Sequence, residues 1–120
     1  MQLHYRYFPC DKPQDDALLI LHGLFGSRNN WAPLARRLAH YQDVYALDLR
    51  NHGDSQHADS MSYPEMANDM LWFMESEDLA CVSILGHSMG GKVAMQFALD
   101  HPHRCGKLVV VDIAPVSYRH

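Results

Sequence analysis

A serine in a glycine-flanked turn is the residue of this chain best suited to do chemistry. Gly86-His87-Ser88-Met89-Gly90 reads G-x-S-x-G, and it stands between an apolar run at 81–86 and a helical pattern. This context predicts a sharp strand-to-helix turn that lifts the Ser88 hydroxyl to the carboxyl edge of a sheet. Gly86 and Gly90 supply the small neighbours that such a turn needs. Ser88 is therefore predicted to be a nucleophile, and His87 to line the substrate pocket.

A second glycine-bearing turn follows another apolar run, 17–22, and contains His22-Gly23-Leu24-Phe25. Backbone N–H groups of Leu24 (or Phe25) and Met89 would form an oxyanion hole for a tetrahedral intermediate. We expect Phe25 to line the substrate pocket as well, and His22 and Gly23 to support the turn.

Asp112 lies in the apolar segment VVVDIAP, at the end of a predicted buried strand. A carboxylate in that setting must be paired or hydrogen-bonded. Because an acid follows the serine in chain order in Ser-Asp-His triads on this kind of sheet, Asp112 is the candidate acid. A structural role in capping the loop is the alternative. The base is missing, since only the terminal His120 follows Asp112, so a histidine beyond residue 120 is expected.

Two further groups of polar residues are interpreted as structural. Asp48 and Arg50 in DLRNHGDS could pair and fix the loop after a strand, with His52 or Asp54 as alternative substrate contacts. The His101-Pro-His-Arg-Cys segment contains metal-ligand residue types but lacks a clear fourth ligand, so no metal site is expected.

The elements that must position these residues alternate along the chain. Alternating aromatic residues predict a strand at 2–8, and apolar runs predict strands at 17–22, 43–48, 81–86 and 107–113. A turn follows the first strand, and helical spacing separates the others. A Ser62–Glu65 capping box with Pro64 predicts the start of the helix between the strands at 43–48 and 81–86. Near-continuous apolar strands alternating with helices indicate an α/β fold with a mostly parallel sheet covered on both faces. The valines at 109–111 would form an uncovered edge, so self-association through that edge stays open.

Composition excludes several classes of protein. The 120 residues carry 10 basic and 14 acidic side chains, a formal charge of −4, and 48% of them are hydrophobic. This balance argues against disorder and against nucleic-acid binding through bulk charge. The sequence has no apolar run long enough for a membrane span and no apolar stretch typical of a signal peptide near its start. Three cysteines without CxxC spacing favour reduced thiols and a cytoplasmic location.

The segments LILHGLFGSRNNW, DLRNHGDS, GHSMGGKVAMQFAL and VVVDIAPVSY together resemble the α/β-hydrolase superfamily, and within it the small bacterial YbfF-type esterases. The resemblance implies that 1–120 is the N-terminal part of a single α/β-hydrolase domain. The helical cap, the last strands and the catalytic histidine would lie in a missing C-terminal half. It also implies that Ser88 is the nucleophile and Asp112 the acid, with short acyl esters or acyl-CoA thioesters as substrates and no cofactor.

Alternative functions remain open from the sequence. The same fold hosts C–C bond hydrolases, lyase-like synthases and haloperoxidases, which share the two glycine turns. A truncated, non-catalytic fragment or interaction module is a reading from a different class. A dinucleotide-binding domain is the weakest alternative, because no G-x-G-x-x-G follows the first buried strand.

Overall fold

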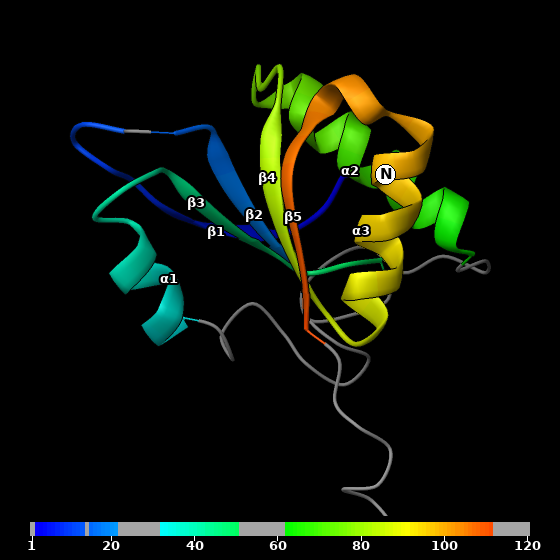
Figure 1. Ribbon diagram of the computed structural model, residues 1–120, viewed down its shortest axis with the longest axis horizontal. Helices are drawn as coiled ribbons and strands as arrows, with labels where there is room; N and C mark the ends of the chain where they lie inside the picture. The colour runs from blue at the N-terminus through cyan, green and yellow to red at the C-terminus, as the bar shows by residue number, and fades with distance from the viewer. Residues whose placement is uncertain (1, 14, 22–31, 51–61, 112–120) are drawn as a thin grey trace, which may run out of the picture.

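A five-stranded sheet organises the chain (Figure 1). The computed structural model describes residues 2–13, 15–21, 32–50 and 62–111. Within these residues the strand order is β1-β3-β2-β4-β5, and only β1 runs antiparallel to its neighbour. The mostly parallel sheet expected from the sequence is therefore confirmed. The strands are β1 (Tyr5–Phe8), β2 (Ala17–Leu21), β3 (Val44–Leu47), β4 (Val82–His87) and β5 (Cys105–Val111).

The central strands are apolar because both faces of the sheet are covered there. Every residue of β3 is buried, as are four of the five residues of β2. Continuous aliphatic runs of this kind are typical of parallel strands that pack against helices on both sides. β2 sits between β3 and β4, so these three strands form the centre of the sheet.

Within the described residues, α-helices α1, α2 and α3 cover the two faces of the sheet (Figure 1). Helix α1 (Ala32–Leu38) lies on one face, where Ala32 and Ala35 pack with residues of β2 and β3. Helices α2 (Tyr63–Ser76) and α3 (Met89–Asp100) lie on the other face and contribute to the larger core cluster. A short 3-10 helix, η2 (Pro102–Arg104), leads into β5. The largest fully buried side chains are Phe73, Phe97, Leu19, Ile20, Leu21, Leu47, Leu49, Met66, Met70, Met74 and Ile84.

The start of α2 confirms the capping box predicted from the sequence. Ser62 Oγ accepts a hydrogen bond from the Glu65 backbone N–H at 3.3 Å, and Glu65 Oε1 accepts one from the Ser62 backbone N–H at 3.2 Å. These two bonds satisfy N–H groups that a helix start otherwise leaves without partners. The chain is thereby fixed where it enters α2.

The strand boundaries differ from prediction mainly at the two ends of the sheet. β1 covers 5–8 rather than 2–8, and β5 begins two residues earlier than expected, at Cys105. Residues 112–113, which were predicted to belong to this last strand, lie outside the described part of the chain. Among the helices that the structure describes, none is both long enough and apolar enough to cross a membrane.

Candidate active site

The predicted nucleophile occupies a strained turn. β4 ends at His87 and α3 begins at Met89, so Ser88 alone makes the connection. Its backbone has φ 56° and ψ −117°, a region that L-residues other than glycine rarely adopt. Ser88 is exposed, and its side chain makes no capping hydrogen bond to the helix. The turn therefore presents an exposed hydroxyl at the carboxyl edge of the sheet, next to the half-buried His87.

Position 86 must be glycine because the backbone at the start of α3 lies very close to it. A Cβ atom at this position would lie 2.5 Å from the Gly90 carbonyl oxygen and 2.7 Å from the Gly91 Cα. Real Cβ atoms essentially never come so near to backbone atoms. Any side chain at 86 would push the start of α3 away from β4 and change the position of the Ser88 hydroxyl.

Gly91 is a residue of this region that the sequence analysis missed. Its own Cβ would lie 2.7 Å from Val110 Cγ1, so the absence of a side chain lets α3 approach β5 closely. The sequence does hold a signal, since Gly90 and Gly91 are adjacent. The G-x-S-x-G turn explains Gly90 but leaves Gly91 without an explanation.

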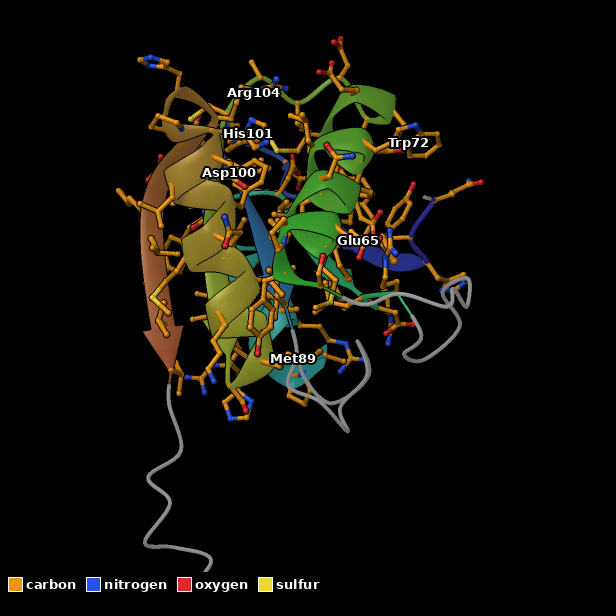
Figure 2. The ribbon with its side chains drawn as sticks, turned by 90° about the vertical axis from the view of Figure 1, so that its right-hand side faces the viewer. Glu65, Trp72, Met89, Asp100, His101 and Arg104 are labelled. Atoms are coloured by element: carbon orange, nitrogen blue, oxygen red, sulfur yellow. The ribbon has the colours of Figure 1, made fainter. Side chains whose placement is uncertain are left out.

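The start of α3 can stabilise negative charge. The Ser88 carbonyl accepts hydrogen bonds from the Gly91 and Lys92 N–H groups, at 2.9 and 3.3 Å. The N–H groups of the first helical residues have no partners within a helix, and the helix dipole adds positive potential there. Figure 2 shows Met89 at this end of α3, the same end at which β5 finishes. The role of the Met89 amide in an oxyanion hole next to Ser88 stays a prediction.

β5 ends beside Ser88. The Ser88 N–H donates a hydrogen bond to the Val111 carbonyl oxygen at 2.9 Å, and His87 pairs with Val111 in the sheet. Asp112 is the next residue, but it lies outside the described residues. Its role as the acid remains a prediction.

The other half of the predicted oxyanion hole also lies outside the described residues. His22, Gly23, Leu24 and Phe25 fall in the segment 22–31. What the structure gives is the strand before them, because Leu21 at the end of β2 pairs with Gly86 of β4. The assignments of these four residues stay predictions.

The end of β3 contains a buried ion pair. Arg50 Nε and Nη2 donate to Asp69 Oδ2 and Oδ1 of α2 at 2.7 and 2.9 Å, and Arg50 Nη1 lies 3.5 Å from Glu65 Oε2. The hydrogen bonds to Asp69 raise the pKa of Arg50 and keep it charged. The structural interpretation of Arg50 is supported. The carboxylate that binds it in bidentate fashion is Asp69, nineteen residues away, which the sequence analysis did not find. His52 and Asp54 lie outside the described residues.

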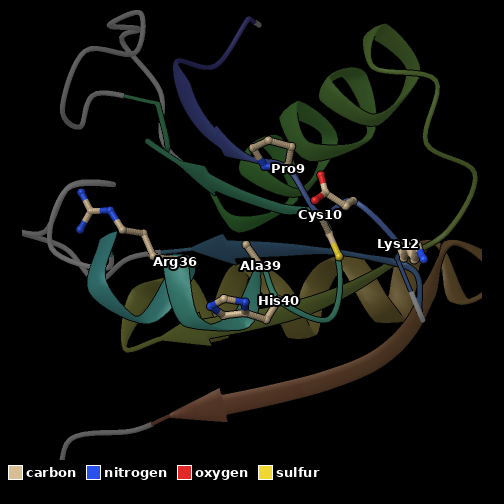
Figure 3. Close-up of a pocket in the computed structure, with 7 residues that line it drawn as sticks. Pro9, Cys10, Lys12, Arg36, Ala39 and His40 are labelled. Atoms are coloured by element: carbon tan, nitrogen blue, oxygen red, sulfur yellow. The ribbon is translucent and has the colours of Figure 1, made fainter.

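A cavity of about 440 Å³ lies elsewhere in the molecule (Figure 3). It is lined by residues that follow β1 and by the end of α1, namely Pro9, Cys10, Asp11, Lys12, Arg36, Ala39 and His40. These residues come from the segments that precede β2 and β3, and Ser88 is not among them. Among the described residues, no group of three or more His, Cys, Asp or Glu side chains is arranged to hold a metal ion.

Comparison with known proteins agrees with this geometry. The chain is 41% identical over 119 residues to the esterase YbfF of Escherichia coli, covering 98% of this chain and 47% of that protein. It is 45% identical over 100 residues to an sn-1-specific diacylglycerol lipase of Xenopus laevis, covering 82% and 32%. A solved structure described as a marine microorganism esterase superposes with a TM-score of 0.88 at 49% identity, covering 95% of this chain and 42% of that one.

The chain spans less than half the length of these relatives. A family model described as the alpha/beta hydrolase fold matches residues 16–120. That match takes in the whole described sheet except β1 and includes the turn at Ser88. The chain belongs to the α/β-hydrolase fold family.

Proposed function

We propose that the protein is a serine hydrolase that cleaves carboxylic esters through Ser88. The observation that carries this proposal is the strained, exposed Ser88 between a buried strand and the start of a helix. Strain of this kind persists only where the surrounding structure enforces it, and it gathers at functional sites. The similarity to an esterase and to a diacylglycerol lipase supports an ester as the substrate.

The proposed reaction is acyl transfer to water in two steps. Ser88 Oγ attacks the ester carbonyl carbon while a histidine base takes the hydroxyl proton, and the negative charge moves to the carbonyl oxygen. The amides of Met89 and Leu24 would hold that oxygen, each worth about 3 kcal/mol. When the tetrahedral intermediate collapses, the alcohol leaves with the proton. Water then hydrolyses the acyl-enzyme by the same route.

Asp112 is proposed to orient the histidine, which we place beyond residue 120. Support for Asp112 comes from its neighbour, because the Val111 carbonyl is hydrogen-bonded to the Ser88 amide. For substrates we propose short acyl esters, and thioesters of the acyl-CoA type as the other class. No metal or organic cofactor enters these steps.

Labelling with a fluorophosphonate tests the nucleophile. The probe is incubated with the chain, with Ser88→Ala and with Ser83→Ala, each with and without about 100 mM imidazole as a replacement base. Ser83 is a matched control because it lies on β4, the strand that leads into the turn at Ser88, but is buried. We expect labelling that imidazole accelerates, that Ser88→Ala abolishes and that Ser83→Ala retains.

If the folded chain is not labelled even with imidazole, or if Ser88→Ala is labelled equally, the proposal is wrong. Short p-nitrophenyl esters then test the acyl-enzyme. We expect a burst of about one p-nitrophenolate per Ser88 before any slower turnover. An acyl-CoA thioester run beside them separates the two substrate classes.

A further inference from the structure

The cavity between the segment after β1 and the end of α1 has no part in the proposed function. Its volume of about 440 Å³ lies within the range of roughly 300–1,000 Å³ that small-molecule sites have. Residues 9–12 form one wall of this cavity and the end of α1 forms the other (Figure 3). β1 and β5 are at opposite ends of the strand order, so the cavity lies on the side of the sheet away from β5. Strands that follow β5 would extend the sheet in the other direction and leave the cavity open.

The charged side chains that line the cavity are mostly positive. Lys12, Arg36 and His40 are exposed there, and Asp11 is the one carboxylate among the lining residues. Within the ranges that the structure describes, the side chains of Lys12, Arg36 and His40 form no ion pair. The whole chain has a formal charge of −4, so a cavity with this balance stands apart from the rest of the molecule. Such a cavity attracts small molecules that carry negative charge.

The wall of the cavity also contains a thiol, that of the half-buried Cys10. The Cys10 backbone N–H donates a hydrogen bond to Asp43 Oδ1 at 2.8 Å, and the Tyr7 hydroxyl donates to the same oxygen at 3.1 Å. Because Asp43 directly precedes β3, these bonds fix the backbone of Cys10 against the sheet. Figure 3 shows the Cys10 sulfur pointing toward α1, with His40 on one side of it and Lys12 on the other. The cavity therefore combines a sulfur nucleophile with groups that attract anions.

The other two cysteines of the chain lie in different surroundings. Cys81 and Cys105 are half-buried like Cys10, but neither lines the cavity. Burial raises the pKa of the Cys81 thiol, and the neighbouring Asp16 carboxylate raises it further. Burial also raises the pKa of the Cys105 thiol. Because the thiolate is the form that attacks a disulfide, both groups are held in their less reactive form. They serve as internal references for Cys10.

We propose that the cavity is a modification site, at which Cys10 forms a mixed disulfide with a small thiol that carries carboxylate groups. The Cys10 sulfur attacks one sulfur of a disulfide made from two such thiols. A new S–S bond forms as the old one breaks, and the other half leaves as a thiolate. The leaving thiolate takes up the proton that Cys10 loses, so the exchange needs no oxidant other than the disulfide. Lys12, Arg36 and His40 attract the carboxylates of the half that stays bound.

Thiol–disulfide exchange with three small disulfides tests the proposal. The chain is incubated with oxidised glutathione, which is anionic, with the cationic cystamine and with the neutral 2-hydroxyethyl disulfide. Peptide mapping by mass spectrometry gives the rate at each cysteine. We expect oxidised glutathione to modify Cys10 about tenfold or more faster than Cys81 or Cys105, and about 0.5 M salt or denaturing urea to reduce this difference. Equal rates at the three cysteines, or faster reaction of Cys10 with cystamine, would overturn the proposal. Neither outcome depends on Ser88.

Reversing the charges of the cavity tests the part assigned to them. We expect Lys12→Glu/Arg36→Glu to slow the reaction of Cys10 with oxidised glutathione about tenfold, and to change the reaction with 2-hydroxyethyl disulfide less than about twofold. Arg37→Glu/Lys92→Glu is the matched control, because it makes the same change of net charge at exposed residues that do not line the cavity. We expect this control to keep the rate of the unaltered chain within about twofold. Equal slowing in the two double variants, or slowing in neither, would show that the cavity does not select the anionic disulfide.

Discussion

The two outer strands of the described sheet, β1 and β5, differ in the side chains that they expose. On β1, Arg6 lies over the Phe8 ring at 5.0 Å from its centroid, and Tyr7 stacks on Tyr45 with ring centroids 4.6 Å apart. The strand then stops at Pro9. On β5, four consecutive aliphatic residues are exposed. β1 therefore has the features of a strand that faces water, whereas β5 has those of a strand that is to be covered.

The halves of the molecule next to these edges also differ in what holds them together. Near β1, long polar and aromatic side chains make the contacts, as in the Arg50–Asp69 pair and the cluster of Tyr5, Tyr45 and Phe73. Near β5, the backbone of α3 comes close to the sheet because Gly86 and Gly91 have no side chains. Near β1, we expect the free energy of unfolding to fall most when one side chain of a pair is removed. Near β5, we expect it to fall most when a methyl group is added to a glycine.

The largest effect is expected on the β1 side, from Arg50→Met. It leaves the Asp69 carboxylate, which is 2% exposed, without the partner that binds both its oxygens. Removing one partner of a buried pair lowers the free energy of unfolding by about 3–5 kcal/mol. Urea denaturation measures the loss. The double variant Arg50→Met/Asp69→Leu should recover most of this loss. A double variant as unstable as Arg50→Met would show that the unpaired Asp69 carboxylate is not the cause of the loss.

Gly86→Ala gives the matching test on the β5 side. The added Cβ meets the Gly90 carbonyl, a backbone group that cannot turn aside. We expect a loss of about 3 kcal/mol, at the upper end of overpacking effects, together with loss of Ser88 labelling. Gly106→Ala is the control, because its Cβ would meet the Asp16 side chain at 3.1 Å and that chain can move. Equal losses of unfolding free energy in Gly86→Ala and Gly106→Ala would contradict the idea that a clash with backbone costs more than a clash with a side chain.

A smaller effect is expected for Gly91→Ala, because its added Cβ meets a side chain, Val110 Cγ1. We expect a loss of about 1–2 kcal/mol, of which Val110→Ala in the same chain recovers about 1 kcal/mol. A double-mutant cycle by urea denaturation measures this coupling. Strictly additive losses would mean that α3 and β5 do not constrain each other at this point.

The smallest effect concerns pH and belongs to the aromatic cluster near β1. Burial, followed by the neighbouring Tyr7 and the carboxylates of Glu77 and Asp43, raises the pKa of Tyr45 to about 12 from the ordinary 10.0. Because the unfolded chain loses this proton first, the stabilisation is complete below pH 10 and declines between about pH 10 and pH 12. We expect Tyr45→Phe to flatten this decline by about 1–2 kcal/mol. An unchanged slope would assign the decline to other groups.

Local patterns were sufficient to predict the elements and the turn. The apolar runs located the strands, and the Ser62–Glu65 spacing located the start of α2, because both depend on neighbours within a few residues. The position of Ser88 between β4 and α3 follows from the same kind of local signal.

Contacts between distant residues could not be predicted in this way. The Arg50–Asp69 pair joins a strand end to a helix nineteen residues later, and many carboxylates in the sequence were equally available. The approach of Gly91 to Val110 depends on the strand order, which places β5 beside β4. For the candidate site the predicted parts are unequal: Ser88 and Met89 are described, whereas Leu24 and Asp112 remain predictions.

The hydrogen bond from the Ser88 amide to the Val111 carbonyl makes Ser88 a reporter of the separation of β5 from β4. Fraying of β5 from its carboxyl end breaks this bond first, and the amide proton of Ser88 then becomes free to exchange with solvent. Deuterium uptake at this single position would thus register whether β5 is held in place, before any change in secondary structure could be seen. Whatever steadies the last strand should slow that exchange, even when it touches no catalytic group.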